Sequence, residues 1–342
     1  MIPGTHDRAD RQAFLGIDGG GTKTSFLLLD GNGRLLARHV ATTSYYLEIG
    51  FDALRSLLRD GVEQVLTLGG IAPWQVASAF AGLPAHGEDS ALLADFDGLL
   101  VGALPRVRIG NDMVCSWAGS LGGGDGISLV AGTGSIAYGE WAGRGARSGG
   151  WGEVFGDEGS AYWLAREGLA LFSRMADGRA APGPLLGRVR EHFQLAHDLD
   201  LCAAINGDAA RSRLAQFARL VSAAAADGDE QATALLGRAG TELAALAGAI
   251  ARQLELPAGA KVPVSYTGGV FEAGTAVTDA LRQALAREVP GAELIAPRFG
   301  PELGAAMYAA RLVGVQLRPA TDAGPHPSPL PQAGEGVLRS PV

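Results

Sequence analysis

Three segments of this sequence combine carboxylates, hydroxyls and glycines in patterns that can support chemistry on phosphate groups. DGGGTKT occupies residues 18–24, ND occupies 111–112, and GGWGEVFGDEGSAYW occupies 149–163. Consecutive glycines let a backbone turn approach a ligand closely, and successive N–H groups of such a turn can bind one anion. Residues 18–24 are therefore a candidate phosphate-binding turn, although taken alone they suit an ordinary hairpin with a flexible tip equally well.

Asp18 supplies the carboxylate of this turn. A carboxylate repels phosphate, but it can hold Mg²⁺, usually through water molecules, and the metal can then hold the phosphates. Thr22, Thr24 and Lys23 add two hydroxyls and one cation nearby. The turn therefore offers the groups that a magnesium–nucleotide complex requires.

A second glycine–threonine turn follows later in the chain. Residues 127–138 again alternate strand, turn and strand, with AGTGS at 131–135. This repeat lacks the carboxylate, because Ala131 or Gly132 stands where Asp18 would be. Two related halves, each with such a turn, can clamp a polyphosphate between them, so the repeat favours phosphate binding over a plain hairpin.

The other two segments place carboxylates at or near the start of helices. Residues 107–112 predict a strand that ends on Asp112, and the next helix begins at 113 with Asn111 or Asp112 near its N-cap. Residues 149–163 predict a glycine-rich loop that leads into a helix capped by Ser160. A surface loop with scattered charge is the plainer interpretation, but the apolar Trp151 and Phe155 argue against a purely solvated loop.

The elements that must position these segments alternate between strands and helices. Three strands are expected within 14–42, two within 127–138, and one each at 76–83, 107–112, 262–270 and 294–296. Helices are expected at 51–68, 88–100, 113–121, 160–175, 184–195, 211–226, 229–254, 275–288 and 304–315.

Length, charge and cysteine content limit the class of protein. A chain of 342 residues suggests two domains, and a net charge of −8 argues against a nucleic-acid or anionic-membrane surface. Cys115 and Cys202 lie far apart, which fits a reduced cytoplasm and excludes a disulfide scaffold. No stretch approaches the ~20 apolar residues of a membrane span. Residues 1–13 and 319–342 are expected to be a disordered leader and a disordered proline-rich tail.

The order of these motifs, closed by TGGV at 267–270, resembles N-acetylglucosamine kinases of the BadF/BadG/BcrA/BcrD group within the actin–hexokinase–sugar kinase superfamily. The resemblance covers about residues 14–316, and the 149–163 segment is its most specific part. It implies an α/β fold of two ribonuclease H-like domains, each with a mixed five-stranded sheet flanked by helices, with a cleft between them. Residues 14–115, completed by a helix at 303–316, would form one domain and residues 116–302 the other.

The resemblance also implies roles for matching positions, with ATP and Mg²⁺ as cofactors and a homodimer as the assembly. Asp112 would be the catalytic base, and Asp18 would bind Mg²⁺ through water. The remaining positions would contact ATP or the sugar. ATP would contact Gly20, Gly21, Thr22, Lys23, Gly132, Thr133, Gly134, Ala215, Gly268 and Gly269, and the sugar would contact Tyr45, Asp112, Ser135, Gly150, Trp151, Gly152 and Asp157.

One position departs from the family pattern. Tyr45 stands where relatives usually carry an asparagine that contacts the amino-sugar, so the pocket for the acetamido group is expected to be reshaped. Glucosamine, N-acetylmuramic acid or another hexose then joins N-acetylglucosamine as a candidate substrate. The expected function is an ATP-dependent amino-sugar kinase acting at the 6-hydroxyl.

Two other functions stay open on the same fold. The first is an ATPase that activates 2-hydroxyacyl-CoA dehydratase or benzoyl-CoA reductase, in which cysteines in glycine-rich loops hold an iron–sulfur cluster. Cys115 and Cys202 fall instead in predicted helices. The second is a sugar-sensing regulatory protein, which would be favoured if Asp18 or Asp112 were missing.

Overall fold

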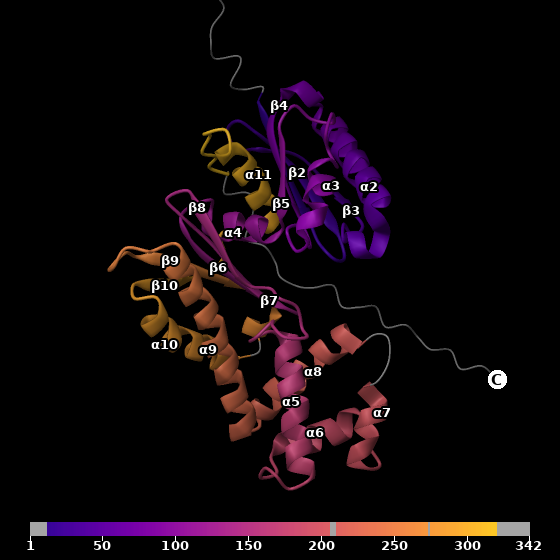
Figure 1. The fold of residues 1–342 in the computed structure, drawn as a ribbon, viewed down its shortest axis with the longest axis vertical. Coiled ribbons are helices and arrows are strands. Elements are labelled where there is room, and N and C mark those ends of the chain that lie inside the picture. The colour runs from indigo at the N-terminus through magenta and orange to yellow at the C-terminus, as the bar shows by residue number, and fades with distance from the viewer. Residues whose placement is uncertain (1–11, 206–209, 273, 320–342) are drawn as a thin grey trace, which may run out of the picture.

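The structure is a computed structural model that describes residues 12–205, 210–272 and 274–319. It contains two sheets, each with its own helices, and Figure 1 shows them as two lobes. Nearly all of the predicted leader and tail lies outside the described residues.

The first sheet has five strands in the order β3-β2-β1-β4-β5. Strands β1, β2 and β3 form an antiparallel meander, whereas β4 and β5 run parallel to β1. A tight glycine turn joins β1 to β2, and a second short turn joins β2 to β3, as predicted for 14–42. The strands are β1 (Ala13–Gly19), β2 (Thr24–Asp30), β3 (Leu35–Ala41), β4 (Val76–Leu83) and β5 (Val107–Asn111).

The second sheet repeats this pattern in the order β10-β9-β6-β7-β8. Strands β6, β7 and β8 form an antiparallel meander, and β9 and β10 add parallel to β6. The predicted α/β fold with two mixed five-stranded sheets is therefore confirmed. The strands are β6 (Gly126–Ala131), β7 (Ser135–Trp141), β8 (Arg144–Gly149), β9 (Val262–Thr267) and β10 (Ala292–Ile295).

Alternating side chains of β1 direct two different helices onto the two faces of the first sheet. Leu15 and Ile17 pack with α2 (Tyr46–Gly69), while Phe14 packs with α11 (Pro301–Arg311). Gly16 also faces α11, because a Cβ there would overlap the backbone nitrogen of Ala306. Helix α11, the last one in the described residues, therefore completes the first lobe, as Figure 1 shows.

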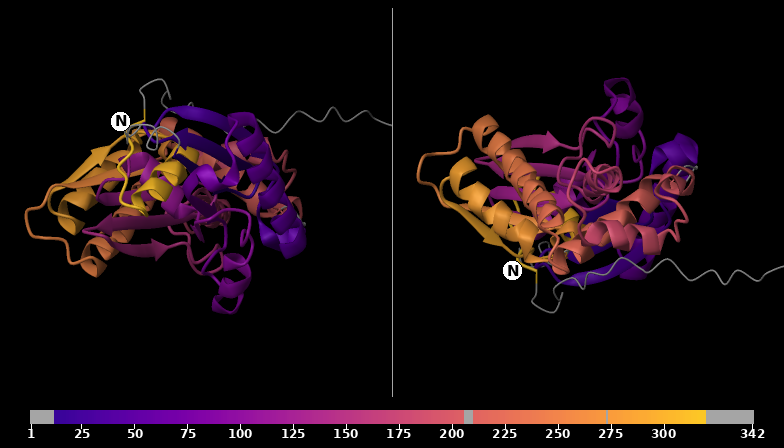
Figure 2. Two further views of the ribbon diagram at one scale, coloured as in Figure 1. Left: turned by 90° about the horizontal axis from the view of Figure 1, so that it is seen from above. Right: turned by 90° about the horizontal axis from the view of Figure 1, so that it is seen from below.

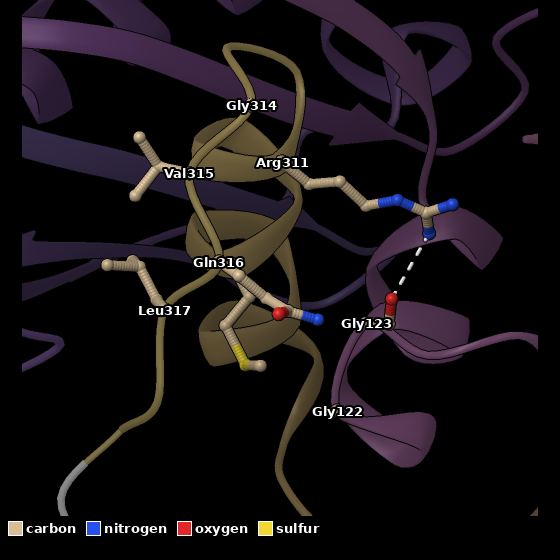
Figure 3. Close-up of a pocket in the computed structure, with 8 residues that line it drawn as sticks. Gly122, Gly123, Arg311, Gly314, Val315, Gln316 and Leu317 are labelled. Carbon is tan, nitrogen blue, oxygen red and sulfur yellow. Dashed lines mark hydrogen bonds between the residues drawn. The ribbon is translucent and has the colours of Figure 1, made fainter.

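Helix α4 (Met113–Leu121) connects the two lobes. It packs against α11 at close range, since a Cβ on Gly304 would overlap the backbone of Cys115 and Gly119. It also contacts β6 and β7 of the second sheet. Beside this junction, between the C-terminal ends of α4 and α11, lies a cavity of about 280 Å³ bordered by Gly122, Gly123 and Arg311 (Figure 3).

A buried ion pair reinforces the junction. Glu140 on β7 is 5% exposed, and its carboxylate accepts hydrogen bonds from Tyr138 at 2.9 Å and Tyr308 at 3.2 Å. The Arg311 guanidinium lies 3.0 Å from the same carboxylate and stacks over the Trp117 ring. Side chains from α4, β7 and α11 thus meet around one carboxylate.

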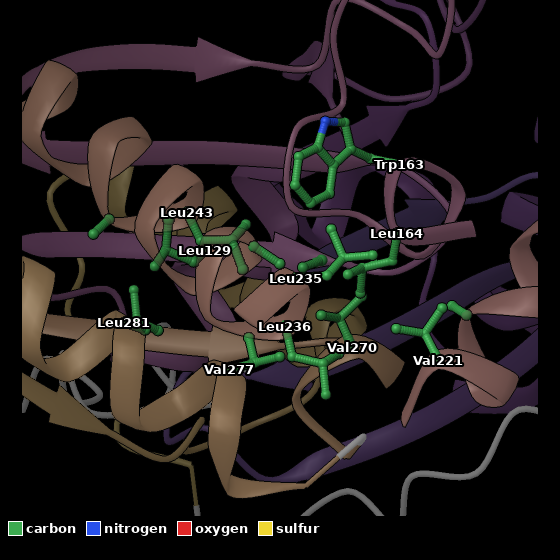
Figure 4. Close-up of a cluster of buried hydrophobic side chains, with 14 of the residues drawn as sticks. Leu129, Trp163, Leu164, Val221, Leu235, Leu236, Leu243, Val270, Val277 and Leu281 are labelled. Carbon is green, nitrogen blue, oxygen red and sulfur yellow. The ribbon is translucent and has the colours of Figure 1, made fainter. Parts of the chain in front are cut away.

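Helices cover the second sheet and extend from it. Helix α9 packs along β6, β7 and β8, and α10 lies beside it, as the view from below in Figure 2 shows. Leu129 of the sheet meets Leu235 and Leu243 of α9 in the core drawn in Figure 4. The helices are α5 (Ala161–Ala176), α6 (Pro184–His192), α7 (Leu201–Ile205), α8 (Ala210–Ala226), α9 (Glu230–Gln253) and α10 (Thr275–Glu288).

Helix α9 is also the one described helix long and apolar enough to cross a membrane by length and composition alone. Its apolar side chains face the protein core, where Leu236, Leu243 and Ile250 are at most 1% exposed. Burial in the core accounts for its apolar composition.

Two predicted helices differ from the structure. The segment expected as a helix at 88–100 contains only a short 3-10 turn, η2 (Ser90–Leu92), and α3 (Leu93–Asp97). The Asp89 side chain accepts a hydrogen bond from Ala91, and Gly98 ends α3 after five residues. Helix α2 begins at Tyr46, but the backbone of Gly50 is non-helical, so its regular part starts near the predicted Phe51.

Candidate active site

The first glycine turn leaves an open, exposed surface at the end of β1. Gly21, Thr22 and Lys23 are exposed, and a Cβ added to Gly21 would meet no atom within 4 Å. The Gly20 carbonyl is anchored instead, accepting from the Thr43 hydroxyl and from the Ser44 N–H, both at 3.2 Å. A fixed turn with free space above it suits the close approach of phosphate oxygens.

Asp18 lies at this turn in a negatively charged environment. Burial raises the pKa of its carboxyl well above the usual value, Asp112 and Glu302 raise it further, and only the Lys23 charge and a hydrogen bond from Cys115 oppose them. Within the described parts of the chain, no group of three or more His, Cys, Asp or Glu side chains could hold a metal. Mg²⁺ commonly uses one or two carboxylates plus water and phosphate oxygens, so Asp18 fits a water-mediated magnesium site.

The second glycine turn joins β6 to β7 and is anchored to α5. The Gly132 carbonyl accepts from the Ala161 N–H at 2.9 Å, and the Thr133 carbonyl accepts from the Tyr162 N–H at 3.2 Å. Thr133 is exposed, and a Cβ at Gly132 would meet nothing within 4 Å. This turn therefore also offers free space above a fixed backbone.

Gly134 leaves room for the buried carboxylate of Asp157. A Cβ there would lie 2.7 Å from Oδ2 of Asp157, so only glycine leaves room for that carboxylate. Asp157 is 3% exposed, and its Oδ1 accepts a 3.4 Å hydrogen bond from the Ser135 N–H. The Ser135 hydroxyl in turn donates to the Glu158 carbonyl at 2.7 Å. Gly134, Ser135 and Asp157, predicted from separate motifs, thus form one cluster.

The paired glycines after β9 lie beside the second turn. Gly268 has φ of +111°, and a Cβ there would overlap the Ala131 carbonyl oxygen, so no other residue fits. Gly269 is exposed, with open space at its Cβ position. Ala215 lies on α8, which packs against α5, α6 and α9, and its contact with nucleotide stays a prediction.

Asp112 occupies the N-cap position of α4, but its side chain does not cap the helix. Oδ1 of Asn111 accepts from the Met113 N–H at 3.1 Å, and Nδ2 of Asn111 donates to the His86 carbonyl at 3.0 Å. Asn111 therefore performs the capping, and the Asp112 carboxylate stays available for a ligand.

The environment of Asp112 suits a general base. Burial raises the pKa of its carboxyl to about 6, and the charge of Glu88 adds to the rise. The nearby Met113 N–H and the positive charge of Arg147 act in the opposite direction. A carboxylate with this pKa is ionised at neutral pH yet more basic than an ordinary aspartate. Asp18 and Asp112 also influence each other electrostatically, so the structure brings these two predicted residues together.

The loop at 149–157 has an unusual backbone. Gly149, Gly150 and Gly152 have φ of +74°, +69° and +85°, and Asp157 has φ of +56°. A non-glycine residue at positive φ is uncommon, and such conformations concentrate at binding sites. The backbone thus turns sharply before Asp157, and this turn places the buried Asp157 side chain beside Gly134 and Ser135.

Trp151 and Phe155 in this loop are 70% and 73% exposed. The argument that apolar side chains would keep this loop from being solvated is therefore wrong for this structure. Exposed large apolar side chains next to a binding loop are common where a ligand or a partner covers them. Trp151 as an apolar wall for a sugar stays a prediction that requires the ligand to cover its ring.

Tyr45 lies at the N-terminus of α2, next to the first glycine turn. Its N–H donates to the Thr43 hydroxyl at 3.0 Å, and Thr43 also bonds the Gly20 carbonyl. The Tyr45 side chain is half-buried and contacts the Tyr46 ring edge-on. One short loop therefore connects the phosphate-binding turn to the predicted sugar contact.

One cation that contacts the 149–157 loop, Arg147 on β8, was not predicted from the sequence. Nothing in its local pattern separates it from a solvated arginine on an edge strand. The sequence predicted that Asn111 or Asp112 would lie near the N-cap of α4, but it did not show which of the two side chains caps the helix.

Residues 15–309 match the BadF/BadG/BcrA/BcrD ATPase family. The chain belongs to this family. An N-acetyl-D-glucosamine kinase from Dictyostelium discoideum is 30% identical over 312 residues, which cover 87% of this chain and 98% of the relative. An N-acetylmuramic acid/N-acetylglucosamine kinase from Clostridium acetobutylicum is 27% identical over 86% of this chain and 97% of its own.

A solved structure agrees with this family assignment. A candidate N-acetylglucosamine kinase from Chromobacterium violaceum is 30% identical, and its structure covers 86% of this chain and 98% of its own with a TM-score of 0.63. The similarity extends over nearly the full length of these proteins, so it includes both lobes.

Proposed function

We propose that this protein is an ATP-dependent amino-sugar kinase, a phosphotransferase with an alcohol group as acceptor. The observation that carries the proposal is the Asp112 carboxylate, which is left available by the Asn111 cap and has a pKa of about 6. Two open glycine turns lie at the ends of β1 and β6, where phosphates can bind. The names of the family members from Dictyostelium discoideum and Clostridium acetobutylicum support an amino-sugar as acceptor.

The proposed reaction is transfer of the γ-phosphoryl group of ATP to a sugar hydroxyl. The hydroxyl oxygen attacks the γ-phosphorus while its proton passes to Asp112, and the bond from phosphorus to the bridging oxygen breaks to release ADP. A positioned base contributes on the order of 10²–10⁴-fold to such a step. Bound through Asp18 and water, Mg²⁺ would supply positive charge at the phosphates.

The remaining predicted residues have binding roles in this proposal. Gly20, Gly21, Thr22, Lys23, Gly132 and Thr133 would lie along the polyphosphate, and Ala215, Gly268 and Gly269 along the nucleoside. Ser135, Gly150, Gly152 and Asp157 would hold the sugar hydroxyls, with Gly134 making room for Asp157. Residues 14–115 with α11 would move as one domain against 116–302.

We propose N-acetylglucosamine or glucosamine as the acceptor and the 6-hydroxyl as the position phosphorylated. Tyr45 bears on the choice, because a phenol replaces the amide that relatives are expected to offer to the acetamido group. A larger aromatic side chain there favours a smaller amino substituent, which glucosamine has.

The iron–sulfur activator function receives less support. Cys115 is 0% exposed inside α4, and burial raises the pKa of its thiol, so it is not available to hold a cluster at a surface loop. Cys202 lies on α7. The regulatory alternative is disfavoured because Asp18 and Asp112 are both present and electrostatically coupled.

A coupled assay of ADP release over a panel of sugars tests the proposal. The panel contains N-acetylglucosamine, glucosamine, N-acetylmuramic acid, N-acetylmannosamine and glucose, each with ATP and Mg²⁺. Amino-sugar-dependent turnover is expected, and ³¹P–¹H correlation spectra of the product should identify phosphate on the C6 oxygen. Absence of turnover above the sugar-free rate with every sugar would refute the kinase assignment. Light scattering of the same sample tests the expected homodimer.

A further inference from the structure

Arg147 binds the backbone of the loop that is proposed to hold the sugar. It lies on β8, an edge strand of the second sheet, opposite Tyr138 of β7. Its Nη2 donates to the Gly150 carbonyl at 2.5 Å, and its Nε donates to the Gly149 carbonyl at 3.3 Å. Its own carbonyl accepts from Gln253 of α9 at 3.2 Å, which fixes the strand beneath it.

The two glycines that Arg147 binds have a conformation that needs support. Gly149 and Gly150 are consecutive residues with positive φ, and glycine loses more backbone freedom on ordering than any other residue. The Gly150 N–H donates to the Ser135 carbonyl at 2.9 Å. Ser135 therefore binds the N–H of Gly150, and Arg147 binds its carbonyl. Hydrogen bonds from a charged donor are stronger than neutral ones, so Arg147 is well suited to order this loop.

We propose that Arg147 is a positioning residue of the acceptor site, which orders the Gly149–Gly152 backbone against the sugar. This inference rests on the proposed kinase function. Lysine keeps the charge but cannot reproduce the two-point donation of a guanidinium, so the two hydrogen bonds can be tested apart from the charge.

Three variants test this role. Arg147→Gln removes the charge and the forked donor, and Arg147→Lys removes only the forked donor. Arg144→Gln is the matched control on the same strand, where the guanidinium binds the Gln253 carbonyl at 3.3 Å and lies 3.6 Å from Glu255. Each variant is measured for kcat and for KM of sugar and of ATP.

Loss of charge-assisted hydrogen bonds that order a binding loop corresponds to roughly 10- to 100-fold in affinity. We expect both Arg147 variants to raise KM for the sugar by about this factor, with KM for ATP changed less than about twofold. Arg144→Gln should change neither KM.

Hydrogen–deuterium exchange of 149–156 gives a readout that does not depend on turnover. Faster exchange of this segment in both Arg147 variants, with unchanged exchange in β6, supports the inference. A sugar KM within twofold of wild type in Arg147→Gln overturns it. If Arg147→Gln does not fold, the KM and exchange of Arg147→Lys decide. An inactive wild-type protein would refute the kinase function itself, whereas unaffected variants of an active protein would refute only the role of Arg147.

Discussion

Replacement of Asp112 by asparagine should make the protein more stable while it removes most activity. The carboxyl pKa rises from 3.8 to about 6 in the folded state, which means that folding favours the protonated form. About two units at 1.36 kcal/mol each amount to roughly 3 kcal/mol, and partial exposure of the side chain reduces this to about 2–3 kcal/mol. Asparagine resembles the neutral carboxyl in size and carries no charge, so it avoids this cost.

The sign of the effect depends on pH. Below the unfolded pKa of 3.8 the carboxyl is protonated in both states and costs nothing. As pH rises through 3.8 toward 6, the unfolded chain ionises before the folded protein does, and stability contributed by this site is lost. Above about pH 6 the full cost is present. The stability gain of Asp112→Asn should therefore be largest at pH 7–8 and shrink toward pH 4.

Thermal and urea unfolding of the ligand-free protein from pH 4 to pH 8 measures this gain. At pH 8 we expect a rise in melting temperature on the order of 5 °C, together with a loss of turnover of about 10²–10⁴-fold. Asp95→Asn on the exposed surface of α3 is the matched control and should change neither quantity. Equal or lower stability of Asp112→Asn at pH 8, or turnover within tenfold of wild type, would show that the burial argument or the base assignment is mistaken.

Three further predictions follow from the same structure. In the wild-type protein, kcat/KM should fall below about pH 6, since Asp112 must be ionised to accept a proton, and a profile that is flat from pH 5 to 8 would contradict this role. Gly16→Ala should destabilise the protein by about 3 kcal/mol or more in urea unfolding, because the added Cβ would overlap the backbone of α11. Gly21→Ala, which has open space at the Cβ position, should retain stability but raise KM for ATP. Equal stability of the two variants would refute the close approach of β1 and α11. Glu140→Gln should lower the free energy of unfolding by about 1–3 kcal/mol, because the carboxylate that binds Tyr138, Tyr308 and Arg311 is lost, and an unchanged urea midpoint would argue against a stabilising role for that junction.

Most of the strands and the two glycine turns could be predicted because their signals are local, but β8 was not among the expected strands, since its sequence RGARSG has no run of large apolar residues. In β1 and β6 a run of apolar residues ends at glycines, and each pattern lies within a few positions of the turn it forms. The helix expected at 88–100 shows the limit of this reasoning. Its composition suits a helix, but the Asp89 side chain caps a 3-10 turn and Gly98 ends the helix.

The contacts within the candidate site were harder to predict because they join distant residues. A Cβ at Gly134 would overlap the Asp157 carboxylate, and no periodic pattern in the sequence encodes such a contact between distant residues. Arg147 acts through the carbonyls of Gly149 and Gly150, and both glycines have positive φ, a backbone conformation that the sequence pattern does not specify. Trp151 and Phe155 misled the sequence argument, because apolar side chains can be exposed where a ligand is to cover them.

The position of α11 has a consequence for synthesis of the chain. Phe14, Leu27 and Leu29 form an apolar face that packs against α11, whose first residue is Pro301. During translation this face leaves the ribosome early, while its cover is made only after nearly all of the second lobe. The first lobe therefore cannot fold to completion on its own, and its nascent strands carry a hydrophobic face that chaperones would recognise. Synthesis of the last helix would close the first lobe.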